Sequence, residues 1–384
     1  MTPIYLDYNA TTPLDPRVIE AMQPYLREAF GNASSAHAYG HAAHDAVVRA
    51  RGQVARLLGA RPAEIVFTSG GTEATNHALK GTVLPALRAR GRATAPHVIT
   101  TTIEHPATAE TCDFLERLGC RVTRIPVDRH GTLDLAALER ALREPTVLVT
   151  VMHANNEVGT VQPIRAVARL AHAHGALVHT DAAQSAGKIP VDVGELGVDL
   201  LSLAGHKMYA PKGVGALYVR EGVALEPLIH GAGHESGRRA GTENVPYVVA
   251  LGMACEVARR DLAEAGVTLR ALRDRLWRRL GEALGDDVVL NGHPEERLPN
   301  TLNVGFVGHV GAELLAAVPE IAASTGSACH EGLVEVSPVL RAMGVAEAVG
   351  RGAVRLSVGR FTTEAEVDRA AALLVARRRA LTPR

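Results

Sequence analysis

The sequence predicts an α/β protein with a large domain on a mainly parallel sheet and a smaller α+β domain towards the C-terminus. Its 384 residues exceed what one compact core usually supports, which favours two domains. Short apolar runs alternate with amphipathic segments of helical length over much of the chain. A long helical stretch then interrupts this alternation, and a different pattern follows it.

The large domain is predicted from apolar runs that begin near residue 64. In order, these runs are E-I-V-F-T, H-V-I-T-T, T-V-L-V-T-V-M, A-L-V-H-T and V-D-L-L-S-L. Strands that read as continuous apolar runs and are joined by helices are typical of a parallel sheet covered on both faces. We expect this domain to span residues 15–258.

The small domain is predicted to begin within a helical stretch from about Glu256 to Leu284, whose apolar residues recur three and four positions apart. After it come T-L-N-V-G-F-V, a helix near Glu313, an open loop with Cys329, A-V-R-L-S-V-G and a C-terminal helix. This mixture of strands and helices indicates an α+β unit. We expect residues 259–384 to form it together with residues 1–14.

The amino-acid composition limits which partners the protein is expected to bind and in which compartment it is expected to act. Lys plus Arg and Asp plus Glu both number 41, and no basic run with interleaved aromatic residues occurs, so we do not expect nucleic acid as a partner. The N-terminus has no basic region followed by an apolar stretch, and apolar runs of about eighteen residues do not occur. We therefore expect a cytoplasmic protein without a membrane segment. Free thiols and no bound metal are expected at the four cysteines, which lack C-x-x-C spacing: Cys112, Cys120, Cys255 and Cys329.

Polar residues just after the apolar runs are candidates for a ligand site, because open α/β sheets bind ligands beyond the carboxyl ends of their strands. The first run is followed by S-G-G-T-E, where a helix is predicted to begin at Gly71 or Thr72. Glycine lets the backbone approach a ligand, and the N–H groups and dipole of a helix start favour a phosphate. The alternative is a plain helix N-cap by Ser69 or Thr72.

Later runs add a histidine, an amide and a carboxylate. His105 follows the second run and Asn156 follows the third. A histidine in such a place is otherwise an ordinary surface residue. The fourth run leads into Asp181, with Gln184 three residues further on. A buried carboxylate is costly without a cationic partner, and a pyridinium nitrogen is a suitable one; the alternative role is again a helix N-cap.

His206 and Lys207 lie in a predicted tight turn after the fifth run, in G-H-K-M-Y-A-P-K-G. Such a turn presents a lysine amine to a carbonyl cofactor, whereas most comparable turns carry only solvated residues. A phosphate-binding helix start, an acid for a ring nitrogen, a stacking imidazole and an amine are together the parts of a pyridoxal 5′-phosphate site. Their combination is more specific than any single member.

The order of these motifs resembles the class V aminotransferase group and, within it, the cysteine desulfurases with a long mobile cysteine loop. The motifs are S-G-G-T-E, T-I-E-H, H-A-N-N-E-V-G, H-T-D-A-A-Q-S-A-G-K, G-H-K-M-Y-A-P-K-G, R-R-A-G-T-E-N and S-T-G-S-A-C. The resemblance runs from residue 6 to near residue 363. It implies the pyridoxal 5′-phosphate-dependent transferase fold of type I, with a mainly parallel seven-stranded sheet, and a homodimer.

The resemblance also implies which residues hold the cofactor. Lys207 joins to its aldehyde and later moves the substrate Cα proton, Asp181 pairs with the pyridine nitrogen and His105 stacks on the ring. Gln184 contacts the ring hydroxyl, and Asn156 lies on the substrate side. The phosphate is held by Gly71, Thr72, His206 and, from the partner subunit, Thr242.

The substrate implied by the resemblance is L-cysteine, with Arg355 clamping its carboxylate and Asn32 assisting. Cys329, in the small-residue run S-T-G-S-A-C-H-E-G, is implied to attack the substrate sulfur and carry it away as a persulfide. L-alanine is the other product. The sulfur then passes to an acceptor protein, such as an iron–sulfur scaffold or a tRNA-thiolation protein.

Two positions depart from the desulfurase pattern, and other functions stay open. Ala204 stands three residues before Lys207, where the family usually has a hydroxyl for the phosphate. His330 follows Cys329, as in selenocysteine lyases of the same group, although an exposed loop histidine is an alternative interpretation. An aminotransferase of the group has no need of Cys329. A binding partner in sulfur-cluster assembly is the remaining alternative, and the intact site residues count against it.

Overall fold

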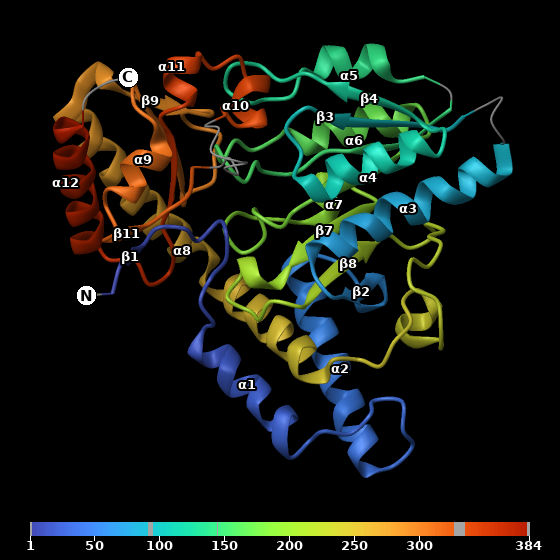
Figure 1. Cartoon of the computed structure of the whole chain (residues 1–384). Helices are drawn as coiled ribbons and strands as arrows, with labels where there is room; N and C mark the ends of the chain where they lie inside the picture. The colour runs from blue at the N-terminus through green and yellow to red at the C-terminus, as the bar shows by residue number, and fades with distance from the viewer. Residues whose placement is uncertain (1, 91–94, 144, 326–334, 382–384) are drawn as a thin grey trace.

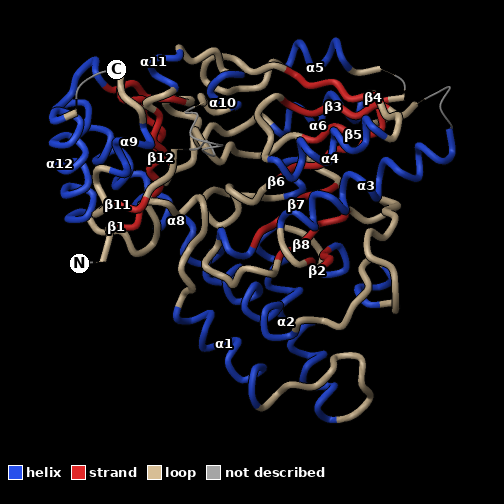
Figure 2. Tube along the Cα trace, in the orientation of Figure 1, coloured by secondary structure: helices blue, strands red, loops and turns tan. Residues whose placement is uncertain are grey.

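The computed structural model describes residues 2–90, 95–143, 145–325 and 335–381. Its largest element is a seven-stranded sheet with the strand order β2-β8-β7-β6-β5-β3-β4 (Figure 2). β8 is antiparallel to both neighbours, and the other neighbouring strands are parallel, as predicted. The strands are β2 (Ile65–Thr68), β3 (His97–Thr101), β4 (Arg121–Ile125), β5 (Thr146–Thr150), β6 (Leu177–Asp181), β7 (Leu200–Ala204) and β8 (Gly215–Val219).

The predicted apolar runs correspond to β2, β3, β5, β6 and β7. β4 and β8 have no counterpart among them. β4 lies at the edge of the sheet, where Ile125 is its only buried residue, so it has no continuous apolar run. β8 is buried throughout, but its sequence G-A-L-Y-V begins with two small residues. Apolar content alone therefore identifies five strands, including the edge strand β2, and misses the edge strand β4 and the inner strand β8.

Helices cover both faces of the large sheet (Figure 1). Buried side chains of α3 and α4 share one core with the strands. Those of α2, α5, α6, α7 and the first part of α8 form the core on the opposite face. This double covering explains why the inner strands are buried at nearly every position. The helices are α2 (Ala38–Leu58), α3 (Gly71–Arg90), α4 (Pro106–Arg117), α5 (Leu135–Ala141), α6 (Ile164–Ala173), α7 (Val193–Leu196) and α8 (Val245–Leu284).

A second sheet of three antiparallel strands, in the order β12-β10-β9, carries its own apolar core. The C-terminal part of α8 and the helix α12 pack in this core, together with residues close to the N-terminus. A short parallel pair, β1 and β11, joins the first residues of the chain to this unit (Figure 1). The elements are β1 (Ile4–Tyr5), β9 (Val288–Asn291), β10 (Thr301–Phe306), β11 (Ile321–Ala322), β12 (Ala353–Ser357), α9 (Gly311–Ala316), α10 (Pro338–Ala342), α11 (Glu347–Gly350) and α12 (Glu364–Ala380).

α8 is a continuous helix of 40 residues that serves both cores. Asn244 caps its start by accepting a hydrogen bond from the N–H of Tyr247. Its early residue Leu251 is buried in the core of the large sheet, and its late residue Leu276 is buried in the core of the small sheet. The domain boundary that we expect between residues 258 and 259 falls inside this helix and stays a prediction.

α1 (Pro16–Arg27) follows the N-terminal segment and packs on α8 through Val18 and Met22. Asp15 caps it by accepting a hydrogen bond from the N–H of Arg17, and Pro16 occupies the first helical position. The segment before α1 therefore leaves the small sheet and enters the large unit. It crosses between the two cores on the way.

Three of the cysteines, Cys112, Cys120 and Cys255, are buried free thiols, as expected. Cys329 lies outside the described residues. Within the described part of the chain, no helix combines the length and apolar content that crossing a membrane requires.

We predict that Phe306→Ala lowers the free energy of unfolding of the small domain by about 3–5 kcal/mol, because it removes a fully buried ring and leaves a cavity. Urea unfolding followed by circular dichroism measures this change. Val289→Ala on the neighbouring strand is the matched control, since Val289 is 38% exposed. Equal effects of the two substitutions would contradict the assigned core.

Candidate active site

A cavity of about 280 Å³ lies beyond the carboxyl ends of β3, β5, β6 and β7. Parallel strands end on the same side of a sheet, so side chains that are distant in sequence converge there. Most residues predicted for the cofactor and substrate line this cavity. They are Gly71, Thr72, His105, Asn156, Asp181, Gln184, His206, Lys207 and Arg355.

Lys207 ends a short 3₁₀ turn, Gly205–Lys207, that follows β7 directly. The turn requires glycine at position 205, because a Cβ there would lie 2.9 Å from a backbone carbonyl oxygen. Nζ of Lys207 donates hydrogen bonds to the carbonyl oxygens of Asn9 and Ala10, at 2.6 and 2.8 Å. Burial, followed by the charge of Arg355, lowers the pKa of Lys207 to about 8. This amine therefore loses its proton more readily than a surface lysine.

Asp181 is the last residue of β6, and its carboxylate is buried at the cavity wall. One of its oxygens accepts a hydrogen bond from the N–H of Ala183, at 2.8 Å. Burial raises the pKa of Asp181, while the nearby His105 and Lys207 act in the opposite direction. A cation placed in the cavity beside this carboxylate would stabilise its charged form.

His105 is the N-cap of α4, and Pro106 occupies the next position. Its Nδ1 accepts a hydrogen bond from the N–H of Ala107 at 3.1 Å, so the ring proton of the neutral form lies on Nε2. Burial lowers the pKa of His105, with Lys207 acting in the same direction. A neutral, flat ring fixed at the cavity wall is suited to stacking on an aromatic ligand.

Gly71 and Thr72 are the first residues of α3, and both line the cavity. The N–H groups of a helix start have no partner within the helix and favour an anion. Ala204, the last residue of β7, closes this end of the cavity; a Cβ added to Gly71 would lie 3.1 Å from the Cβ of Ala204. His206 contributes a ring at the same wall, held by a 3.2 Å contact between its Nδ1 and the hydroxyl of Thr11.

Arg355 reaches the cavity from β12 of the small sheet. Its guanidinium donates to the carbonyl oxygen of Asn156 at 3.1 Å and to the carboxylate of Asp7 at 2.9 Å. Its Nε is buried and has no hydrogen-bond partner among the described residues. A buried donor without a partner costs free energy, so this guanidinium is prepared for an anionic ligand such as a carboxylate.

Comparison with known proteins assigns this arrangement to a family. The model of the class V aminotransferases matches residues 4–370. A cysteine desulfurase IscS of Anaeromyxobacter sp. (strain Fw109-5) is 49% identical over 382 residues, covering 99% of this chain and 93% of the relative. The chain belongs to the cysteine desulfurase group of the class V aminotransferases. This group depends on pyridoxal 5′-phosphate, and the resemblance predicted from the motifs is confirmed.

Other similar proteins lead to the same family assignment. A cysteine desulfurase IscS of Pectobacterium carotovorum subsp. carotovorum (strain PC1) is 47% identical over 371 residues, covering 95% of this chain and 90% of the relative. A solved NifS-like protein has a TM-score of 0.92 at 41% identity, covering 99% of this chain and all of that chain (100%). A solved structure described as SspA in complex with cysteine has a TM-score of 0.81 at 38% identity, covering 94% and 100% of the two chains. The predicted fold class is therefore confirmed.

Asn32 and Thr242, both predicted for the active site, do not line the cavity. Asn32 is exposed in the segment between α1 and α2, where its side-chain oxygen accepts from the N–H of Ser34. Thr242 is exposed just before α8, and we expected it to act in the site of a partner subunit. Cys329 and the adjacent His330 lie outside the described residues. The roles assigned to these residues stay predictions.

The structure also places at the site residues to which the sequence assigned no role. Asp7 accepts from Arg355, and the hydroxyl of Ser324 donates to its other oxygen at 2.9 Å. The carbonyl oxygen of Asn9 accepts from both Lys207 and Gln184, at 2.6 and 3.0 Å. Asp7 and Asn9 belong to the segment L-D-Y-N-A-T-T-P, residues 6–13, where the resemblance begins, and its polar residues were the available signal.

We predict that Ala204→Ser tightens binding of pyridoxal 5′-phosphate about 3- to 10-fold, because it adds one hydroxyl donor beside the start of α3. The dissociation constant, measured by titrating the cofactor-stripped protein with the cofactor, tests this. Ala204→Cys is the control for size, since a thiol is a weak donor. Equal affinities of the two variants would show that no phosphate oxygen lies near this position.

Glu104 is a buried carboxyl directly behind the site. It accepts hydrogen bonds from the hydroxyl of Thr101 at 2.6 Å and from the N–H of Met152 at 3.0 Å. Burial raises the pKa of Glu104 to about 8, and the charge of Asp181 adds to the increase. Glu104 therefore keeps its proton in the folded protein at neutral pH.

This raised pKa predicts a pH dependence of stability. Between the ordinary value of 4.5 and about 8, the folded state holds a proton that the unfolded state releases, so stability falls as pH rises through this window. Glu104→Gln lacks the titrating group, so from pH 5 to 8 wild type should lose about 2–4 kcal/mol relative to this variant. Urea unfolding at several pH values measures the difference. The exposed Glu110→Gln on α4 is the control, and a pH-independent difference for Glu104→Gln would contradict the assignment.

Proposed function

We propose that the protein is a cysteine desulfurase, which converts L-cysteine to L-alanine and leaves the sulfur as a persulfide on Cys329. The observation that carries this proposal is the convergence of Lys207, Asp181, His105 and Arg355 on one cavity. The names of the relatives support a desulfurase rather than a selenocysteine lyase or an aminotransferase.

The residues at the cavity fit pyridoxal 5′-phosphate. Asp181 offers a buried carboxylate to a pyridinium nitrogen, and His105 offers a neutral ring face. The start of α3 at Gly71 offers backbone N–H groups to the phosphate, and Lys207 offers an amine of lowered pKa. When bound, the cofactor supplies an aldehyde that condenses with amines and a protonated ring that stabilises negative charge at the substrate Cα.

Arg355 and Lys207 divide the work on the substrate. The guanidinium of Arg355 binds the substrate carboxylate, because its buried Nε lacks another partner in the described structure. This contact orients the Cα–H bond towards Lys207. With a pKa near 8, the amine of Lys207 is present in part as the free base at neutral pH and accepts the Cα proton.

Cys329 takes the sulfur. Its thiolate attacks the substrate sulfur, a bond forms between the two sulfur atoms, and the bond from the substrate sulfur to Cβ breaks. The Cβ carbon gains a proton in place of the sulfur, which gives alanine, while the transferred sulfur becomes the outer atom of the persulfide. Substrate carbon is reduced and sulfur is oxidised, so no external reductant or oxidant is needed for this step.

We also propose a cellular location, an oligomeric state and a class of partner for the protein. The protein acts in the cytoplasm as a homodimer, in which Thr242 of one chain is available to the site of the other because it is exposed on its own. The persulfide passes to an acceptor protein, such as an iron–sulfur scaffold or a tRNA-thiolation protein. Relatives named as cysteine desulfurases support sulfur transfer as the reaction, and this transfer requires an acceptor.

We predict that Lys207→Ala abolishes the visible absorbance band that arises when the lysine joins to the cofactor, because the amine is lost. Cys329→Ser should keep that absorbance and lower alanine release from L-cysteine by roughly 1,000-fold or more, because a hydroxyl does not accept the sulfur. Absorbance spectra and alanine release per minute in the presence of a reductant measure the two effects.

Lys212→Ala, an exposed lysine after the same turn, and Cys120→Ser are the matched controls. Full alanine release by Cys329→Ser would rule out the persulfide route. Release from L-selenocysteine measured in parallel separates the alternatives: if only that substrate reacts, the lyase is the better description, and His330 becomes the residue to examine.

A further inference from the structure

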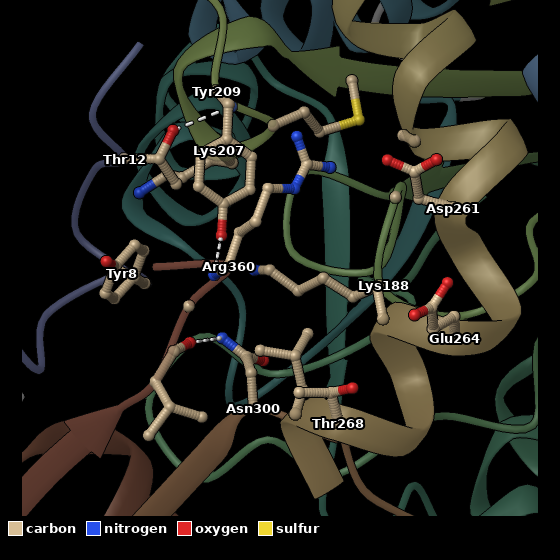
Figure 3. A pocket seen from close by; sticks show the side chains of 17 residues that line it. Tyr8, Thr12, Lys188, Lys207, Tyr209, Asp261, Glu264, Thr268, Asn300 and Arg360 are labelled. Atoms are coloured by element: carbon tan, nitrogen blue, oxygen red, sulfur yellow. Dashed lines mark hydrogen bonds between the residues drawn. The ribbon is translucent and has the colours of Figure 1, made fainter. Parts of the chain in front are cut away.

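Lys188 is a second buried lysine beside the candidate active site. It lies beyond β6, in Q-S-A-G-K, and the residue is only 8% exposed. Its Nζ donates to Oε1 of Gln184 at 3.0 Å. Lys188 is not among the residues that line the cofactor cavity but lines an adjoining cavity of about 240 Å³, to which Lys207 also contributes (Figure 3).

The two contacts of Gln184 fix the orientation of its amide. Oε1 accepts from Lys188, and Nε2 donates to the carbonyl oxygen of Asn9 at 3.0 Å. The carbonyl oxygen of Asn9 only accepts, so the Gln184 atom that faces it is Nε2, and reversing the amide would place oxygen against oxygen. Nε2 carries a second N–H in addition to the one bound by Asn9. Because Gln184 lines the cofactor cavity, this N–H is available to a ligand there.

Keeping an amine at this position is costly. Burial, followed by the charges of Lys207 and Arg355, lowers the pKa of Lys188 to about 7. An apolar side chain of similar length would fill the same space without that cost. The hydrogen bond to Gln184 is the interaction of Lys188 that an apolar side chain does not reproduce.

We propose that Lys188 is a positioning residue, which holds the amide of Gln184 so that its N–H faces the ring hydroxyl of the cofactor. This role rests on the proposed function, because Gln184 has a ring hydroxyl to bind only when pyridoxal 5′-phosphate occupies the cavity. Lys188 itself touches neither the cofactor nor the substrate. It acts through Gln184, and Gln184 is linked through the carbonyl oxygen of Asn9 to Lys207.

A double-mutant cycle tests this dependence. Wild type, Lys188→Met, Gln184→Ala and the double variant are stripped of cofactor as full-length proteins and titrated with pyridoxal 5′-phosphate. Each single substitution should weaken binding about 5- to 20-fold, the effect of one lost hydrogen bond, and change the visible spectrum in the same direction. The double variant should bind and absorb like Gln184→Ala, because Lys188 has no effect once its partner is missing.

Matched variants separate this role from folding and from charge. Lys212→Met removes an exposed lysine of the neighbouring turn and should bind like wild type. Lys188→Arg keeps the donor, has the adjoining cavity to extend into, and should restore the wild-type spectrum even if Lys188→Met is poorly folded. Thermal unfolding of every variant shows whether affinity changes follow stability.

Three results would overturn the role. Wild-type affinity and spectrum in Lys188→Met would show that the contact does not matter. Additive losses in the double variant would show that Lys188 acts independently of Gln184, through its charge or through packing. If wild type bound no pyridoxal 5′-phosphate, both the role of Lys188 and the proposed function would fail. If wild type bound the cofactor but the cycle were additive, only the role of Lys188 would fail.

Discussion

The crossing of the N-terminal segment between the two sheets is the constraint on which the site depends. Asn9 donates to Thr301 of the small sheet through its side chain, at 2.8 Å, while its carbonyl oxygen accepts from Lys207 and Gln184 of the large unit. Two residues earlier, Asp7 pairs with Arg355 of the small sheet. The groups that would hold the cofactor and those that would hold the substrate are therefore positioned by one stretch of backbone.

Burial shifts the pKa values of the acids and of the amines around this segment in opposite directions. It raises the pKa of Asp181 and Glu104, and it lowers the pKa of Lys207 and Lys188. Each shift favours the neutral form of its group relative to the same group in water. Groups with perturbed pKa values that gather in and around one cavity are typical of a catalytic centre. A bound cofactor with a cationic ring nitrogen and an anionic phosphate would supply the charges that these groups lack.

Much of the fold was predictable because burial on both faces gives most strands a short apolar run. The edge strand β4 was not predictable in this way, because its residues other than Ile125 are exposed or only partly buried. The second core was foreseen from the change of pattern after α8. The entry of α8 into both cores was not foreseen. A continuous amphipathic helix has no sequence signal at the point where it leaves one core and enters the other.

The sequence by itself determined the chemistry, because strand ends and turns are local and the residues found there, Asp181, Lys207 and His105, belong to recognisable motifs. Only the tertiary structure decided how that chemistry is supported. The partners of Arg355 and the chain of contacts from Lys188 through Gln184 to Lys207 join segments that no local pattern relates. Burial and hydrogen bonding between distant residues arise when the chain is folded, so they are decided by the packing of the two cores and not by the spacing of residues.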